Sequence, residues 1–176
     1  MPAARFIDAL NDQVANEFGA SHQYVAIGAH YESQTLPQLA RFFYAQAAEE
    51  RGHAMMMVKY LIDTDSPVRL REVAAPAAEF ADHIAPIRMA LEQERTVSRQ
   101  ISELFAVARE EHDYLSEQFV QWFLKEQVEE EATMLELLDV AERVRDQPMT
   151  LEEFIAREQP GGDHSDPLAP DEAGAA

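Results

Sequence analysis

The chain has 176 residues and is 47% hydrophobic, which fits one globular domain with its own core. It contains no cysteine, which excludes disulfides, thiolate zinc sites and iron–sulfur clusters. Its 33 acidic and 14 basic residues give a formal net charge of −19, which argues against nucleic acid or an anionic membrane as a partner. Cations are the better guess, although an acidic surface can also simply keep a protein in solution.

The first residues lack the apolar stretch of a signal peptide. No apolar run approaches the roughly 20 residues that a membrane-spanning helix needs. We therefore expect a soluble, cytoplasmic protein without a membrane partner.

Apolar residues recur about every 3.5 positions in four long segments, each of which predicts a helix of roughly 40 Å. The segments are residues 5–33, 37–64, 83–110 and 113–145. The first two and the last two are joined by only a few residues, so each pair predicts an antiparallel hairpin. Residues 65–82 could extend to about 60 Å at roughly 3.3 Å per residue, enough to run back along the bundle. The sequence thus predicts an all-α four-helix bundle with one long crossover.

The limits of the last segments come from turn and capping residues. Asp113 is a good N-cap for the fourth helix, and Pro148 ends that segment. The run Thr150-Leu-Glu-Glu153 has the pattern of a capping box, which predicts a short fifth helix from Thr150 to about residue 158. From Pro160 the chain is rich in Pro, Gly, Asp and Ala, which predicts disorder. The predicted organisation is a domain at residues 1–159 and a disordered tail at 160–176.

Each of the four helical seams is interrupted by a carboxylate near its middle. These residues are Glu17, Glu50, Glu94 and Glu130. A carboxylate in an apolar core costs several kcal/mol unless it is paired, hydrogen-bonded or bound to metal, and no Lys or Arg shares these seams. His53 lies on the same helix face as Glu50, and oxygen ligands with one imidazole suit iron or manganese. The alternative is a partly protonated layer that holds water.

The combination of motifs resembles the ferroxidase motifs of bacterial non-haem ferritins, in particular the actinobacterial ferritins of the B type. The motifs are Glu17, Glu50-Arg-Gly-His53, Glu94 and Glu126-Gln-Val-Glu-Glu130, and the resemblance covers about residues 5–158. It implies a ferritin-like four-helix bundle with one long crossover and a short fifth C-terminal helix. It also implies an iron-storage protein that oxidises Fe(II) with O2 or peroxide and stores ferric oxide mineral inside a cage of 24 identical subunits.

The same resemblance assigns roles to single residues. The first iron would be bound by Glu17, Glu50 and His53, with Gln127 beside it, and the second by Glu50, Glu94 and Glu130. A third iron site, known in some of these ferritins, would use Glu49, Glu126 and Glu129; the alternative is an exposed acidic strip. Tyr24 and Trp122 match aromatic residues that flank the centre, with core packing as the alternative.

Two departures separate the chain from neighbouring families. Bacterioferritins carry a second Glu-x-x-His motif where this chain has Gln127-Val-Glu-Glu130, and a haem-binding Met where it has Arg51. We therefore expect no haem. Two other functions remain open from the sequence. One is a di-iron oxidase or peroxidase of the rubrerythrin type that stores no iron, and the other is a structural bundle without a working centre.

Overall fold

The computed structural model describes residues 2–161 and 166–174. Within these ranges it contains five helices and no strand: α1 (Ala4–Ser33), α2 (Pro37–Asp63), α3 (Ala85–Glu110), α4 (Tyr114–Arg143) and α5 (Pro148–Glu158). The predicted all-α class and the four long helices are therefore confirmed. None of the helices in the described ranges is long and apolar enough to cross a membrane.

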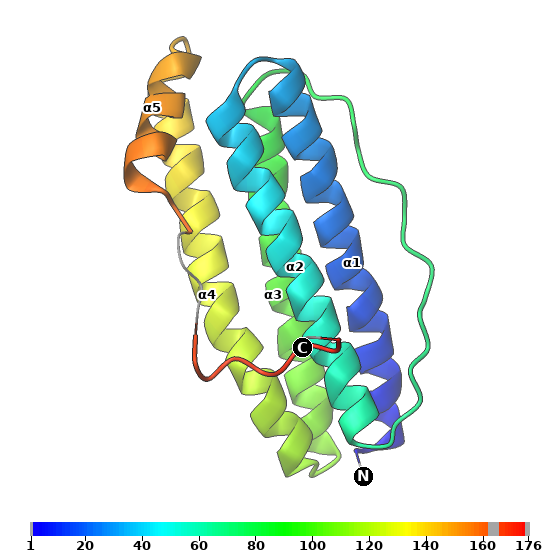
Figure 1. The fold of residues 1–176 in the computed structure, drawn as a ribbon. Coiled ribbons are helices and arrows are strands. Elements are labelled where there is room, and N and C mark those ends of the chain that lie inside the picture. The colour runs from blue at the N-terminus through cyan, green and yellow to red at the C-terminus, as the bar shows by residue number, and fades with distance from the viewer. Residues whose placement is uncertain (1, 162–165, 175–176) are drawn as a thin grey trace.

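The bundle is built from two antiparallel hairpins, α1–α2 and α3–α4 (Figure 1). The segment between α2 and α3 runs along the outside of α1 for the length of the bundle, so α2 and α3 are parallel. The side chain of Asn11 holds this crossover: its Nδ2 donates to the carbonyl of Pro67 at 3.1 Å, and its Oδ1 accepts from the backbone N–H of Arg69 at 2.5 Å. The predicted single long crossover is confirmed.

The two hairpin turns use left-handed residues that are not glycine. Thr35 has a φ of 60° and His112 a φ of 54°, and these conformations end α1 and α3. Asp113 then caps α4, because its side chain accepts a hydrogen bond from the backbone N–H of Ser116 at 3.2 Å. The predicted cap at Asp113 is confirmed.

The predicted start of the fifth helix is wrong. Helix α5 begins at Pro148, two residues before Thr150, with Gln147 as its N-cap, and the Gln147 side chain accepts no hydrogen bond from the backbone N–H groups of the first turn. Proline is favoured in a first helical turn because its fixed φ suits the helix and its missing N–H would have no partner there. Pro148 therefore starts α5 rather than only ending the segment before it.

Buried apolar side chains form two separate clusters. One contains Tyr24, Phe43, Leu91 and Met134, and it includes Leu151 and Ile155 of α5. The other contains Val14, Met57, Val97 and Phe123. Between these positions each long helix carries buried polar side chains, so the core is divided by a polar layer near the middle of the bundle.

Candidate metal centre

The polar layer brings the predicted ligands together from all four long helices. Glu17 comes from α1, Glu50 and His53 from α2, Glu94 from α3, and Gln127 and Glu130 from α4. All six are at most 6% exposed. The helices place them there because each carboxylate occupies a core position of its helix, so that packing the apolar residues on either side also buries the carboxylates.

Three of these residues approach closely enough to share one ion. Ligand atoms of Glu17, Glu50 and His53 all lie within 4.8 Å of one another, and no other group of three does so among the described residues. Nδ1 of His53 lies 3.2 Å from Oε2 of Glu50. These are the residues expected to bind the first iron. Glu94 and Glu130, expected at the second iron, share the layer but do not form a group that close, and all of these roles stay predictions.

Two carboxylate oxygens in the layer have no hydrogen-bond partner although they are buried. They are Oε2 of Glu17 and Oε1 of Glu130. A buried acceptor without a donor costs about 1 to 3 kcal/mol, and more when it is charged. No lysine or arginine is among the buried residues described. The donor set therefore fits hard or borderline cations that prefer oxygen with some nitrogen, such as iron.

Burial and mutual repulsion disfavour the charged forms of the carboxyl groups. Burial, followed by the charges of Glu94 and Glu17, raises the pKa of Glu50 well above its ordinary value. Burial likewise raises the pKa of Glu94 to about 7, and burial with the nearby Glu49 raises the pKa of Glu130 well above its usual range. Without a cation, the layer therefore retains protons that free glutamate side chains would lose.

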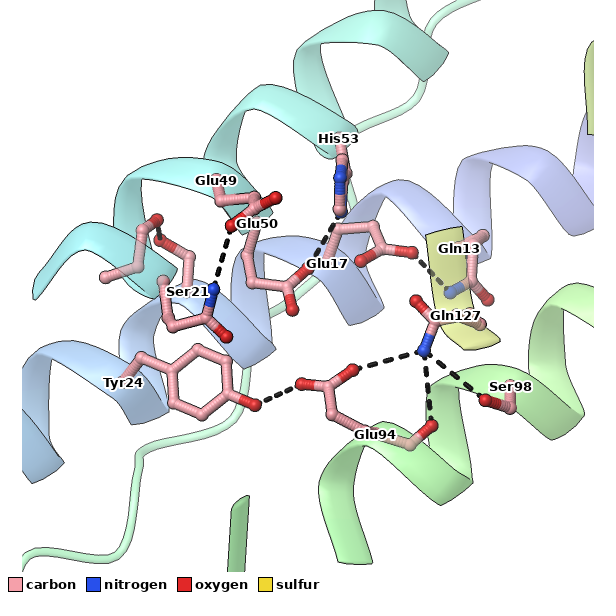
Figure 2. A network of polar contacts seen from close by, with 12 residues as sticks. Gln13, Glu17, Ser21, Tyr24, Glu49, Glu50, His53, Glu94, Ser98 and Gln127 are labelled. Atoms are coloured by element: carbon pink, nitrogen blue, oxygen red, sulfur yellow. Dashed lines mark hydrogen bonds and ion pairs between the residues drawn. The ribbon is translucent and has the colours of Figure 1, made fainter. Parts of the chain in front are cut away.

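Hydrogen bonds from neighbouring side chains orient Glu94 (Figure 2), and an aromatic ring packs against His53. The hydroxyl of Tyr24 donates to Oε1 of Glu94, and Nε2 of Gln127 donates to Oε2 of Glu94 at 3.1 Å. The His53 ring packs edge-on against Trp122 with their ring centroids 5.6 Å apart. Tyr24 and Trp122 therefore both contact predicted ligands.

The residues expected at a third iron site differ in exposure. Glu126 is only 4% exposed, whereas the Glu129 side chain is 55% exposed and lies 3.6 Å from the ammonium group of Lys125. The pKa of Glu126 is raised, because the effect of burial exceeds the opposing effect of nearby His53. Glu126 is thus not part of an exposed acidic strip. With Glu49 and Glu129 it does not form a group as close as that around His53, and the third site stays a prediction.

The described part of the tail lies against α2 and α4. Asp166 accepts hydrogen bonds from Nε1 of Trp122 and from the Lys125 ammonium group, each at 3.2 Å. The backbone N–H of Ala173 donates to the carbonyl of Met55 at 3.1 Å. No helix forms in residues 166–174, and residues 162–165 and 175–176 lie outside the described part. The disorder expected for 160–176 therefore stays a prediction.

A pocket of about 440 Å³ lies between the tail, α2 and α4. It is lined by the acidic residues Glu49, Glu126 and Glu172, and it reaches His53. The pocket was not foreseen, because Ala169 and Glu172 line it from positions more than 40 residues after Glu126 and leave no local pattern.

Gln13 was missed by the sequence analysis. It is 3% exposed, and its Nε2 donates to Oε1 of Glu17 at 2.8 Å. The available signal was the spacing of four residues, which places both side chains on one face of α1.

The fold and this layer define a four-helix bundle with a candidate metal centre in its core. Residues 7–144 match the family model described as a ferritin-like domain. The chain is 48% identical over 172 residues to ferritin BfrB of Mycolicibacterium smegmatis, covering 98% of this chain and 94% of that protein. It is 35% identical over 146 residues to the bacterial non-heme ferritin of Staphylococcus aureus, covering 83% of this chain and 88% of that protein.

Solved structures give the same result. An open-pore ferritin from Archaeoglobus fulgidus superimposes with a TM-score of 0.85 at 27% identity, covering 92% of this chain and 98% of that one. The chain therefore belongs to the ferritin family. Membership of this family supports a role in iron storage.

Proposed function

We propose that this chain is the subunit of an iron-storage ferritin that oxidises Fe(II) to Fe(III) at a di-iron ferroxidase centre. The observation that carries the proposal is the pair of buried, unpartnered carboxylate oxygens of Glu17 and Glu130. They lie in a layer in which burial raises the pKa values of Glu50, Glu94 and Glu130, and a cation relieves both the missing hydrogen bonds and the repulsion between carboxylates.

Two Fe(II) ions are the substrates of the centre. The first is bound by Glu17, Glu50 and His53, whose ligand atoms already lie within 4.8 Å of one another. The second is bound by Glu50, Glu94 and Glu130. Glu50 belongs to both sets and bridges the ions, which brings them close enough to react with one oxidant molecule.

Each Fe(II) gives up one electron. One O2 molecule accepts the two electrons with two protons and leaves as hydrogen peroxide; when peroxide is the oxidant, it takes two electrons and two protons and leaves as two water molecules. Carboxylates suit this substrate because they bind both oxidation states of iron. Tyr24 and Gln127 hold Glu94 in orientation through their hydrogen bonds, so the ligand set is arranged before iron arrives.

Fe(III) then leaves the centre and is stored as hydrated ferric oxide inside a cage of 24 subunits. The acidic residues Glu49, Glu126 and Glu129 form a third iron site next to the centre. In the cage, α5 packs around a fourfold axis. No haem takes part, since Arg51 occupies the position where bacterioferritins carry their haem-binding Met.

An anaerobic Fe(II) titration followed by exposure to oxygen, combined with measurement of particle mass, tests this function. Cages of 24 chains of 19.9 kDa have a mass of about 480 kDa. We expect two or three Fe(II) ions per chain, rapid oxidation when oxygen is admitted, and a particle of that mass that takes up much more iron in later additions.

Other outcomes separate the rival functions. A small particle that oxidises iron but never holds more than two or three ions per chain would be a di-iron oxidase or peroxidase of the rubrerythrin type. A cage that binds no Fe(II) in the polar layer would be a structural bundle without a working centre. Either result would contradict the proposal.

A further inference from the structure

Gln13 lies directly behind one of the proposed ligands. It sits on α1 one turn before Glu17 and is almost fully buried. Its Nε2 donates to Oε1 of Glu17 at 2.8 Å, whereas Oε2 of Glu17 is buried without a partner (Figure 2). The two oxygens of this carboxylate are therefore inequivalent: one is occupied by a protein donor, and the other is available to a cation.

The orientation of the Gln13 amide is itself fixed. Its Oε1 accepts a hydrogen bond from Nδ2 of Asn16 at 3.1 Å. A glutamine amide presents an acceptor at one side and a donor at the other, so the contact with Asn16 turns the donor side towards Glu17. The chain of contacts runs from exposed Asn16 through buried Gln13 to Glu17, all on α1.

We infer that Gln13 is a positioning residue that makes Glu17 bind the first iron through Oε2 alone; the inference rests on the proposed function. A carboxylate can bind a metal through one oxygen or through both. The hydrogen bond from Gln13 holds Oε1 away from the metal and fixes the rotation of the carboxylate group. Hydrogen bonds of this kind, made to a ligand rather than to the metal, typically change metal affinity by about 10- to 100-fold.

Gln13→Leu tests the inference, because leucine is similar in size and cannot donate a hydrogen bond. The probe is Co(II), added without oxygen to the metal-free assembled protein. We expect the first Co(II) to bind about tenfold more weakly than in the unsubstituted protein. We also expect weaker visible absorption per Co(II), because binding through both oxygens of Glu17 raises the coordination number. A residue needed only for packing would not change this spectrum.

Two further variants support the interpretation. Gln100→Leu is the matched control, since Gln100 lies on α3 and no contact joins it to Glu17 among the described interactions; Co(II) affinity and spectrum should not change. Asn16→Ala changes an exposed residue and removes the contact that orients the Gln13 amide. It should shift the spectrum in the same direction as Gln13→Leu with a smaller loss of affinity, and it decides the question if Gln13→Leu does not fold.

The outcomes distinguish this inference from the proposed function. If the unsubstituted protein binds Co(II) and both the Gln13→Leu and Asn16→Ala variants keep its affinity and spectrum, the positioning role is overturned and the proposed function stands. If the unsubstituted protein binds no Co(II), both are overturned.

Discussion

Below about pH 7 the Glu94 carboxyl group retains a proton in the metal-free fold, since burial raises its pKa from 4.5 to about 7. The folded protein therefore binds this proton more tightly than the unfolded chain does. Its contribution to stability is complete below about pH 4.5 and is lost as the pH rises through about 7. For Glu94 alone the loss is on the order of 3 kcal/mol per subunit.

The metal-free protein should accordingly have a lower thermal midpoint at about pH 8 than at about pH 5.5. Glu94→Gln should reduce this difference, because an amide does not titrate, and added Zn(II) should reduce it in the unsubstituted protein by replacing the protons. Calorimetry of the metal-free protein at the two pH values measures the effect. An equally large pH dependence in Glu94→Gln would show that Glu94 is not its source.

A second prediction for a single residue concerns the part of Glu130 in Fe(II) oxidation. Its Oε1 is buried without a partner, and in the proposed function it binds only the second iron. Glu130→Ala should slow the fast phase of Fe(II) oxidation at least tenfold, because losing only a hydrogen-bond partner of a metal ligand typically costs about 10- to 100-fold and Glu130 is itself a proposed ligand. Stopped-flow absorbance of the ferric product measures the rate, with Glu136→Ala, an exposed glutamate on the same helix, as the control. Unchanged kinetics in Glu130→Ala would mean that the second iron is wrongly placed.

The sequence could predict the layer of the proposed ligands because a carboxylate on an apolar seam is unusual on its own. Glu17, Glu50 and Glu94 each interrupt such a seam, and the structure buries all three. Gln13 lacked this signal, because its amide is uncharged and its presence in a helix does not indicate a metal site. Its role depends on a partner one turn away and on the orientation of its side chain.

Among the helices, α5 depends most on distant contacts. Glu152 is 5% exposed, and its carboxylate accepts hydrogen bonds from the backbone N–H groups of Gln38 and Leu39, both at 2.8 Å. These N–H groups lie in the first turn of α2, where they lack partners within the helix and where the helix dipole favours negative charge. Glu152 thus joins α5 to the start of α2.

Glu152→Gln should weaken this joint, because the amide has one acceptor oxygen and its NH2 group faces a backbone donor. We expect a loss of about 1 to 3 kcal/mol in the free energy of unfolding. Thermal unfolding and hydrogen exchange at Gln38 and Leu39 would measure it. Glu153→Gln is the matched control, as Glu153 is exposed on the same helix. Equal stability of the two variants would show that the buried contacts contribute little.

The four long helices could be predicted because their apolar period is long and uninterrupted. Helix α5 was harder to predict from the sequence. Its first turn depends on Pro148, and its position depends on Glu152, whose partners lie more than 100 residues earlier. Local patterns contain no information about such a contact. The wrong start at Thr150 has a local cause, because Pro148 was interpreted only as the end of the fourth segment and not as the first residue of α5.

Exposed apolar side chains on the bundle indicate where whole subunits contact one another. Leu115 and Tyr114, in the first turn of α4, are 69% and 73% exposed in the single chain. Exposed neighbouring apolar residues of this kind often mark contacts between proteins. We expect this turn to be buried between subunits of the cage.

Leu115→Glu should therefore reduce the particle mass below the roughly 480 kDa of the proposed 24-subunit cage while leaving the polar layer intact. The smaller particles should still bind two Fe(II) per chain and oxidise them rapidly, because every proposed ligand of the centre comes from one chain. Further iron should precipitate, because no enclosed space remains to hold it. Leu168→Glu, the same substitution at an exposed leucine of the tail, should leave mass and storage unchanged. If Leu115→Glu lowers the particle mass but the protein still stores iron, then mineral storage does not depend on the cage. That result would contradict the proposal that the assembled cage stores the iron which each chain oxidises.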